Sequence, residues 1–382
     1  MNFVPSGCPL TPLKFFILFV LFVFLKNFIS FPGIAMDLVP PKDKWNLIYI
    51  TLVIHGLGTL TAWNMFITAK EYFEDYKLAK APELSAHYLT YVGWASQMPN
   101  LVFSWLNIFV KIGGNLATRI IWSLSIEVAI FVVTIILAMA DTSEHPEMFF
   151  WMTMLSVFLL NTFNAIFQNS VYGVAAKLPP KYTGGVVLGS NICGTLVVFL
   201  SWTSKMFDSK RTSAIYYFIG GMFVLLICFD TYFALPLNNS PSRSTIPYGT
   251  ILKQSAVQLY NIFIVFFVSL AVFPAVQSEI ESKNGFLGDD FVTITCFLTF
   301  NLTAMIGNIT ASLWQYPTRR WLVVFTTIRI LFIPFFFLCN YKAGDRTLPI
   351  VIDNNWVYWL GGAVLGWSSG HGSSLGMMYV TG

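Results

Sequence analysis

Charged residues are scarce in this sequence. Aspartate, glutamate, lysine and arginine make up 10% of its 382 residues, against about 25% in typical soluble domains. Hydrophobic residues make up 56%, and the mean hydropathy is +0.67. A water-soluble chain of this length could not bury so much apolar surface. The net charge of +4 is small and no long basic run occurs, so we expect no nucleic-acid partner.

Motifs for metals, cofactors and catalysis are also missing. The five cysteines are widely separated, and neither HExxH nor GxxxxGK[ST] occurs, which argues against a metalloenzyme or an ATP-driven pump. The sequence "GSSLG", residues 372–376, matches the G-x-S-x-G nucleophile elbow beside His371. That elbow requires a turn between a strand and a helix, whereas this stretch is part of an apolar segment. We therefore expect no enzyme activity, no cofactor and no metal.

What the sequence does contain is a series of long apolar segments. A helix needs about 20 mostly apolar residues to cross a bilayer. Ten segments qualify: 45–69, 88–110, 119–140, 148–172, 184–203, 214–236, 258–278, 291–314, 320–340 and 356–380. The sequence therefore predicts an all-α polytopic membrane protein with about ten transmembrane helices. Such a chain is a transporter, a channel or an intramembrane enzyme rather than a single-pass receptor.

The loops between these segments predict the orientation. If the amino terminus is cytosolic, the inner loops carry lysine and arginine without acidic residues, and the outer loops hold most of the acids. We therefore expect a multi-pass protein with a cytosolic amino terminus.

Polar side chains at membrane depth predict a cavity. In the fourth segment, three amides and a phenol fall on one helical face, because they are spaced i, i+3, i+7 and i+11. These residues are Asn161, Asn164, Gln168 and Tyr172. In the eighth segment, Asn301 and Asn308 also align. Polar groups in hydrocarbon usually face protein or a water-filled path, so both faces are candidate cavity walls.

The first segment permits two interpretations. Gly56, Leu60, Trp63 and Ile67 form one stripe, with Asn64 beside it. Trp63 and Asn64 are suited to line a cavity, while the glycine is equally suited to close helix packing.

Ionisable residues at depth leave an alternative open. Glu127 or Asp230 could relay protons, and either could instead form a buried pair. A proton-coupled carrier of another small solute or organic cation is therefore the competing hypothesis.

The sequence also resembles a known family. "GLGTLTAWNMFITAKEYF", "ASQMPNLVFSWLN", "FQNSVYGVAAKLPPKYTGGVVLGSNICG", "VFPAVQSEI", "CFLTFN", "IRILFIPFFFLCN" and "SSGHGSSLGMMY" occur in that order between residues 41 and 380. Together these runs resemble helices one, two, four to five and seven to ten of the equilibrative nucleoside transporter family (solute carrier family 29).

The resemblance implies a major-facilitator-like bundle of eleven helices, six plus five, around a central pocket. It implies facilitated diffusion of nucleosides, and sometimes nucleobases, by alternating access at the plasma membrane. The expected substrate-binding residues are Leu60, Trp63, Asn64, Met98, Asn164, Gln168, Asn301 and Asn308. The expected packing or gating residues are Gly189, Gly194, Arg119, Arg329, Gly366 and Gly370. The expected partners are a nucleoside or nucleobase and the lipid bilayer.

Three departures from the family pattern stand out. The proline of helix one is Ala62, and the Asp and Arg that many members carry in helix eight are Ala304 and Asn308. The chain also ends where helix ten of the family ends. We therefore expect an extension over 1–36, a six-helix bundle over 37–236, a cytosolic loop over 237–257 and a four-helix second bundle over 258–382 without the family's last helix. An inactive truncated isoform is the alternative function.

Overall fold

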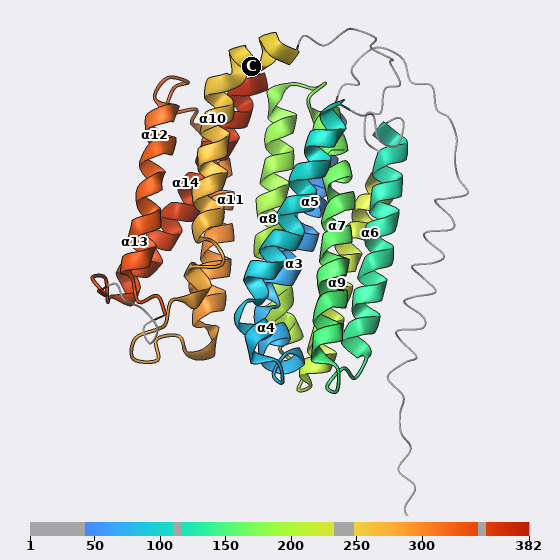
Figure 1. The fold of residues 1–382 in the computed structure, drawn as a ribbon. Helices are drawn as coiled ribbons and strands as arrows, with labels where there is room; N and C mark the ends of the chain where they lie inside the picture. The colour runs from blue at the N-terminus through green and yellow to red at the C-terminus, as the bar shows by residue number, and fades with distance from the viewer. Residues whose placement is uncertain (1–42, 110–115, 233–247, 343–348, 382) are drawn as a thin grey trace, which may run out of the picture. The chain divides into compact units, whose positions relative to one another are not determined.

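The computed structural model describes residues 43–109, 116–232, 248–342 and 349–381. They belong to one unit, and the predicted extension over 1–36 lies outside the described residues. Helices dominate the described part, which contains no β-strand (Figure 1). In hydrocarbon, only a helix satisfies every backbone hydrogen bond within one segment, and this explains the architecture.

The first half of the chain contains eight α-helices in the described residues. They are α2 (Leu47–Thr59), α3 (Thr61–Thr68), α4 (Pro82–Ala86), α5 (Tyr88–Phe109), α6 (Leu116–Met139), α7 (Pro146–Ala175), α8 (Pro180–Ser204) and α9 (Lys210–Thr231). Short α4 lies at one end of the bundle, and the long helices run beside one another (Figure 1). Helix α7 packs on α5 and α6, while α2 packs mainly on α8.

The second half contains five α-helices in the described residues. They are α10 (Tyr248–Val272), α11 (Thr299–Leu313), α12 (Leu322–Ile328), α13 (Phe332–Leu338) and α14 (Asn355–Thr381). A π-helical turn, Thr293–Leu298, leads directly into α11. Helix α14 packs on α10 and α11, and α8 of the first half contacts both α11 and α14. The two halves thus meet along α8.

The helices confirm an all-α membrane protein. Among the described residues, six helices are long and apolar enough to cross a membrane, and the bent pair α2 and α3 would make a seventh span. The ten predicted segments each coincide with a helix or a broken helix. The segment from α12 to α13 is shorter than a membrane span, and α5 and α14 are not among the helices that are both long and apolar enough to cross a membrane. The total of ten spans therefore stays a prediction. Helix α10 begins at Tyr248, so helical structure extends into the predicted loop over 237–257.

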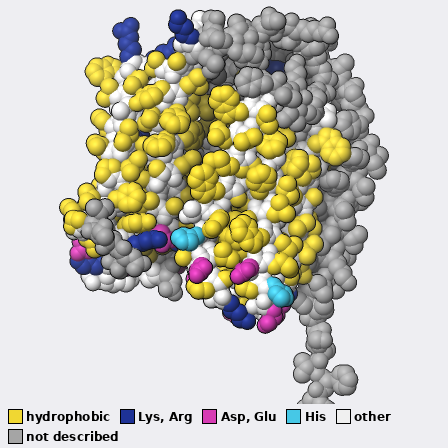
Figure 2. Space-filling model, in the orientation of Figure 1, with side chains coloured by type: hydrophobic (Ala, Val, Ile, Leu, Met, Phe, Trp, Pro, Cys, Tyr) yellow, Lys and Arg dark blue, Asp and Glu magenta, His cyan; other side chains and the backbone are white. Residues whose placement is uncertain are grey.

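The surface fits a lipid environment. Figure 2 shows hydrophobic side chains covering most of the described face between the two ends of the helices. Large apolar side chains such as Trp94, Trp122 and Phe263 are exposed in the described structure. Acidic and histidine side chains gather toward the lower end of this view (Figure 2). A continuous apolar surface of this kind is suited to acyl chains rather than to water.

The first membrane segment is broken at Leu60. Helix α2 ends at Thr59, α3 begins at Thr61, and the two are bent by 44°. Leu60 has φ −114° and ψ 5°, which is outside the α-helical region. A break of this kind leaves carbonyl groups that other side chains must satisfy.

Glycines allow two helix pairs to approach closely. A Cβ atom at Gly189 would lie 2.0 Å from the Val53 carbonyl oxygen, and so α8 can contact α2 only with glycine there. A Cβ at Gly366 would lie 2.2 Å from Thr303 Oγ1 of α11, and one at Gly370 would lie 1.9 Å from the Ala304 carbonyl. The side of α14 that carries Gly366 and Gly370 therefore packs on α11.

Candidate functional site

A cavity of about 230 Å³ lies between the two halves of the chain. Its first-half wall is formed by Leu60, Trp63, Asn64, Gln97, Asn100, Asn161, Asn164, Gln168, Tyr172, Val187, Ser190 and Asn191. Its second-half wall is formed by Phe266, Ser269, Leu270, Phe273, Phe300, Asn301, Ser369, Gly370, Ser373 and Met377. Small-molecule sites usually have volumes of about 300 Å³ or more, so this cavity is slightly smaller than the lower end of that range.

Helix α7 contributes the face that periodicity predicted. Asn161, Asn164, Gln168 and Tyr172 all line the cavity. Asn161 and Asn164 are buried, whereas Gln168 is half-buried. One helical stripe therefore places three amides and a phenol along one wall.

The break in the first membrane segment positions two further lining residues. Trp63 and Asn64 lie in the first turn of α3, directly after the bend at Leu60. Asn164 Nδ2 donates to the Thr59 carbonyl at 2.7 Å, so α7 satisfies the backbone at the break. The bend and the polar wall of α7 thus stabilise each other.

The buried amides are held in defined orientations. Asn161 Nδ2 donates to the Val157 carbonyl at 2.8 Å, and Asn301 Nδ2 donates to the Phe297 carbonyl at 2.8 Å. One N–H of each amide is therefore bonded to the preceding helical turn, which orients the side chain and leaves the second N–H and the amide oxygen for a ligand. Asn164 Oδ1 is buried and has no hydrogen-bond partner in the described structure. The cavity accordingly presents amide oxygens, together with further amide N–H groups, to a ligand.

Aromatic side chains supply the apolar part of the lining. The rings of Phe273 and Phe300 stack, with centroids 4.0 Å apart and an interplanar angle of 9°. Trp63 adds an indole from the first half. Flat rings offer stacking surfaces to a planar ligand.

Two serines of the second wall are connected to a buried arginine. The hydroxyls of Ser269 and Ser369 lie 2.9 Å apart and both residues line the cavity. Arg329 is 1% exposed, and its Nη2 donates to Ser269 Oγ at 2.9 Å. The same guanidinium donates to the carbonyls of Val265 in α10 and Leu365 in α14. Arg329 therefore joins α10 to α14 behind the cavity wall.

None of the described residues that line the cavity carries a charged side chain. Glu127 is fully buried in α6, and its two oxygens have no hydrogen-bond partner in the described structure, but it does not line the cavity. An unpaired ion in the cavity would have only dipoles around it, which is costly at low dielectric. The lining is therefore suited to neutral polar solutes.

The structure brings six of the eight predicted binding residues to the cavity. They are Leu60, Trp63, Asn64, Asn164, Gln168 and Asn301. Met98 is not among the lining residues, and its side chain is 43% exposed. Asn308 is also outside the lining. It donates to the Val187 carbonyl of α8 at 3.2 Å and accepts from Ser374 Oγ of α14 at 2.5 Å.

The remaining predicted positions lie at helix contacts. A Cβ at Gly194 would lie 1.8 Å from Asn301 Oδ1, so the absence of a side chain there makes room for that amide. Arg119 of α6 donates to Asn107 of α5. Both arrangements connect neighbouring helices, and neither Gly194 nor Arg119 lines the cavity.

Several lining residues escaped the sequence analysis. Ser190 and Asn191 of α8 belong to this group, as do Ser369 and Ser373 of α14. The spacing of Ser369, Ser373 and Met377 at i, i+4 and i+8 was a usable signal. Gly366 and Gly370 of the same helix were instead expected to be packing or gating residues.

The elbow-like sequence around His371 is not a catalytic site in this structure. It lies inside α14, without the strand-to-helix turn that such an elbow needs. His371 Nε2 donates to the Tyr316 carbonyl at 2.7 Å. Ser374 Oγ donates to Asn308. Both side chains are committed to structural hydrogen bonds.

Comparison with known proteins gives a consistent result. Residues 154–242 and 238–381 match the family model for "Nucleoside transporter". The chain is 27% identical to rat equilibrative nucleoside transporter 3 over 90% of this chain and 84% of that protein. It is 26% identical to human equilibrative nucleoside transporter 1 over 89% of this chain and 90% of that protein. It is 23% identical to Arabidopsis thaliana equilibrative nucleotide transporter 8 over 84% of each.

Proposed function

The chain belongs to the nucleoside transporter family, and from this premise we propose that it carries nucleosides across a membrane by facilitated diffusion. The family is one of transporters rather than enzymes. The comparisons support neither a proton-coupled carrier of another solute nor an inactive truncated isoform.

The uncharged, amide-rich cavity between the halves is the observation that carries this proposal. A nucleoside is neutral and combines a flat base with hydroxyl and N–H donors. Stacking surfaces and amide oxygens fit those groups. A phosphorylated compound would bring charge into a lining without a cation, so we expect nucleotides to bind more weakly than nucleosides.

We assign the binding roles as follows. Trp63 stacks on the base, while Gln168 offers both a donor and an acceptor to the base edge. Asn164 and Asn301 accept from donor groups of the substrate through their amide oxygens. Leu60 and Asn64 complete the wall at the bend.

Two of the predicted residues receive indirect roles. Asn308 fixes the junction of α8, α11 and α14 close to the cavity. Because arginine has only donors, the Arg329 guanidinium donates the hydrogen bond and Ser269 Oγ accepts it. This bond orients the Ser269 hydroxyl, which in turn contacts the Ser369 hydroxyl. We propose that Arg329 is a positioning residue for the second wall.

Transport assays in proteoliposomes test the function. Purified protein should equilibrate radiolabelled uridine or adenosine between outside and inside, with the same final level whether or not a pH gradient is applied. Empty liposomes give the background. Competition by nucleobases and by nucleotides, each at equal concentration, defines the substrate class.

The outcome separates the alternatives. Accumulation above the external concentration that needs a pH gradient, and that Glu127→Gln abolishes, would favour the proton-coupled carrier. A well-folded protein without any uptake would favour the inactive isoform. We propose the plasma membrane as the location, on the basis of the family resemblance, and a cytosolic amino terminus, on the basis of the loop charges.

A further inference from the structure

Two lysines connect the halves at the end of the bundle that carries α4. Lys70 follows α3 in the first half, and its Nζ lies 2.5 Å from Glu279 Oε1 in the second half. Lys205 follows α8 in the first half, and its Nζ lies 3.2 Å from Asp290 Oδ1 in the second half. By the proposed orientation, this end of the bundle faces the outside of the cell.

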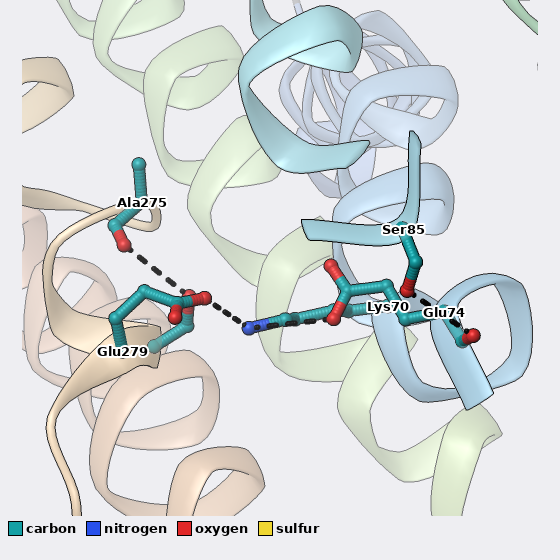
Figure 3. Close-up of polar contacts among 6 residues, drawn as sticks. Lys70, Glu74, Ser85, Ala275 and Glu279 are labelled. Atoms are coloured by element: carbon teal, nitrogen blue, oxygen red, sulfur yellow. Dashed lines mark hydrogen bonds and ion pairs between the residues drawn. The ribbon is translucent and has the colours of Figure 1, made fainter. Parts of the chain in front are cut away.

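Each lysine also has an acidic partner in its own half. Lys70 lies 3.7 Å from Glu74, one helical turn further along the chain. Lys205 lies 3.2 Å from Glu71. Figure 3 shows Lys70 between Glu74 on its own segment and Glu279 on the other side. The same arrangement therefore occurs twice, with one cation shared by an acid from each half.

Both sides of the Lys70 contact are anchored within their own half. Ser85 Oγ of α4 donates to the Glu74 carbonyl at 3.3 Å and holds the Tyr72–Lys77 turn. In the second half, the Lys342 N–H donates to the Glu279 carbonyl at 3.2 Å. Separation of the halves would consequently pull Lys70 away from Glu279 as two rigid parts move.

The Lys70 contact is the stronger of the two. The side chains of Lys70 and Glu279 are 15% and 33% exposed, whereas those of Lys205 and Asp290 are 39% and 48% exposed. Exposed ion pairs contribute little because water screens them. Removal of one partner from a more buried pair leaves a charge without compensation, which is unfavourable.

We propose that Lys70 is an exchange latch for the outer side of the carrier. In the closed state it bonds Glu279 across the halves, and during opening it transfers to Glu74, so that the lysine stays paired throughout. Lys205 makes the corresponding exchange from Asp290 to Glu71 in a more solvated position. This inference rests on the proposed transport by alternating access, and it adds the residues that set the balance between the closed and open states.

The two acids therefore have opposite effects. Loss of Glu279 removes the cross-half bond and should favour the open state. Loss of Glu74 removes the partner that receives Lys70 and should disfavour the open state. If the ion pairs were merely structural, loss of Glu279 and loss of Glu74 would shift the equilibrium between the open and closed states in the same direction, or would leave it unchanged.

Distances between spin labels test this prediction without substrate. Cysteines at exposed Met206 in the first half and Asn284 in the second half carry the labels, in a background with Cys8→Ser. The four described cysteines are buried and should not react. We expect Glu279→Gln to raise the population with a long distance about tenfold, in line with the loss of a charged hydrogen bond. We expect Glu74→Gln to lower this population.

Two controls keep the test decisive. Asp353→Asn removes an ion pair with Lys283 at the same end but within the second half, and it should leave the distances unchanged. The double change Lys70→Glu with Glu279→Lys keeps a cross-half pair and should restore the closed distance, even if the single variant folds poorly. The latch is refuted if the double variant is as open as Glu279→Gln, or if Glu279→Gln and Asp353→Asn give the same distances. Because no substrate is present, neither result depends on whether nucleosides are the cargo.

Discussion

At the scale of single residues, the amide groups decide what the cavity can bind. Asn161 and Asn301 bond their NH2 groups to the helix backbone, whereas Asn164 leaves a buried oxygen unpaired. An unpaired buried acceptor is unfavourable unless a ligand or water donates to it. A substrate group that donates to Asn164 Oδ1 would therefore contribute to binding.

Gln168→Ala tests the binding role of one residue. We expect the KM for nucleosides to rise roughly three- to thirtyfold, because a lost hydrogen bond costs about 0.5–1.5 kcal/mol and more if a group stays unpaired. The neighbouring change Asn169→Ala is the control, because Asn169 bonds Ser104 of α5 and does not line the cavity. Equal KM values for both variants and the parent, across nucleosides and nucleobases, would show that the cavity serves another solute.

At the scale of helices, the glycine contacts set how closely α14 approaches α11. A Cβ at Gly366 would lie 2.6 Å from the Phe300 carbonyl oxygen in addition to the contact with Thr303. Backbone atoms cannot move aside as the end of a flexible side chain can. The contact therefore requires glycine at this position.

Gly366→Ala should lower thermal stability in detergent by about 1–3 kcal/mol, the usual effect of overpacking. Gly93→Ala in α5 is the matched control, because a Cβ there would meet no atom within 4 Å. Since alanine favours helix more than glycine does, Gly93→Ala should be neutral or stabilising by about 0.5–1 kcal/mol. Equal melting temperatures for the two variants would contradict the packing argument.

The sequence allowed the helices to be predicted better than their contacts. Lipid requires long apolar helices, so the long apolar runs in the sequence were enough to locate the ten helical segments. Periodicity on α7 placed Asn161, Asn164, Gln168 and Tyr172 on the cavity wall, where they lie.

Other features depend on neighbouring helices. The bend at Leu60 depends on Asn164 of α7, which donates to the backbone beside it. Met98 lies on a face of α5 that stays exposed. Asn308 shares a face with Asn301 but lies two turns further along α11, where α8 and α14 enclose it. A single helix pattern identifies a polar face but does not show which neighbour covers each turn.

At the scale of the whole molecule, the orientation in the membrane is open to direct measurement. Glu144 and Lys177 are exposed at opposite ends of α7. In a Cys8→Ser background, we expect a cysteine at 144 to react with an impermeant maleimide on intact cells. A cysteine at 177 should react only after permeabilisation. The reverse pattern would overturn the proposed orientation.

The pH dependence of stability should depend on the carboxyl of Glu74. Burial raises the pKa of Glu74 from 4.5 to about 7; Lys70 opposes the shift, while Glu279 and Asp75 add to it. Because the folded protein holds this proton more tightly than the unfolded chain, stability should fall as the pH rises from about 4.5 to about 7.

Glu74→Gln should therefore melt at a higher temperature than the parent at pH 8 and at a similar temperature near pH 4.5. The gain at pH 8 is on the order of 1–3 kcal/mol, since one pKa unit corresponds to about 1.4 kcal/mol. Glu83→Gln, an exposed change on α4, is the control and should leave the pH profile unchanged. A parent profile that Glu74→Gln does not alter would show that another group governs the titration.

The uncharged lining has one more consequence, which concerns the membrane potential. A neutral solute held by neutral groups moves no charge through the field, although moving one elementary charge across 100 mV is worth about 2.3 kcal/mol. Voltage would then exert no force on the bound solute. The direction of net flow would follow the two concentrations alone, and a cell could reverse it simply by consuming or releasing the solute on one side.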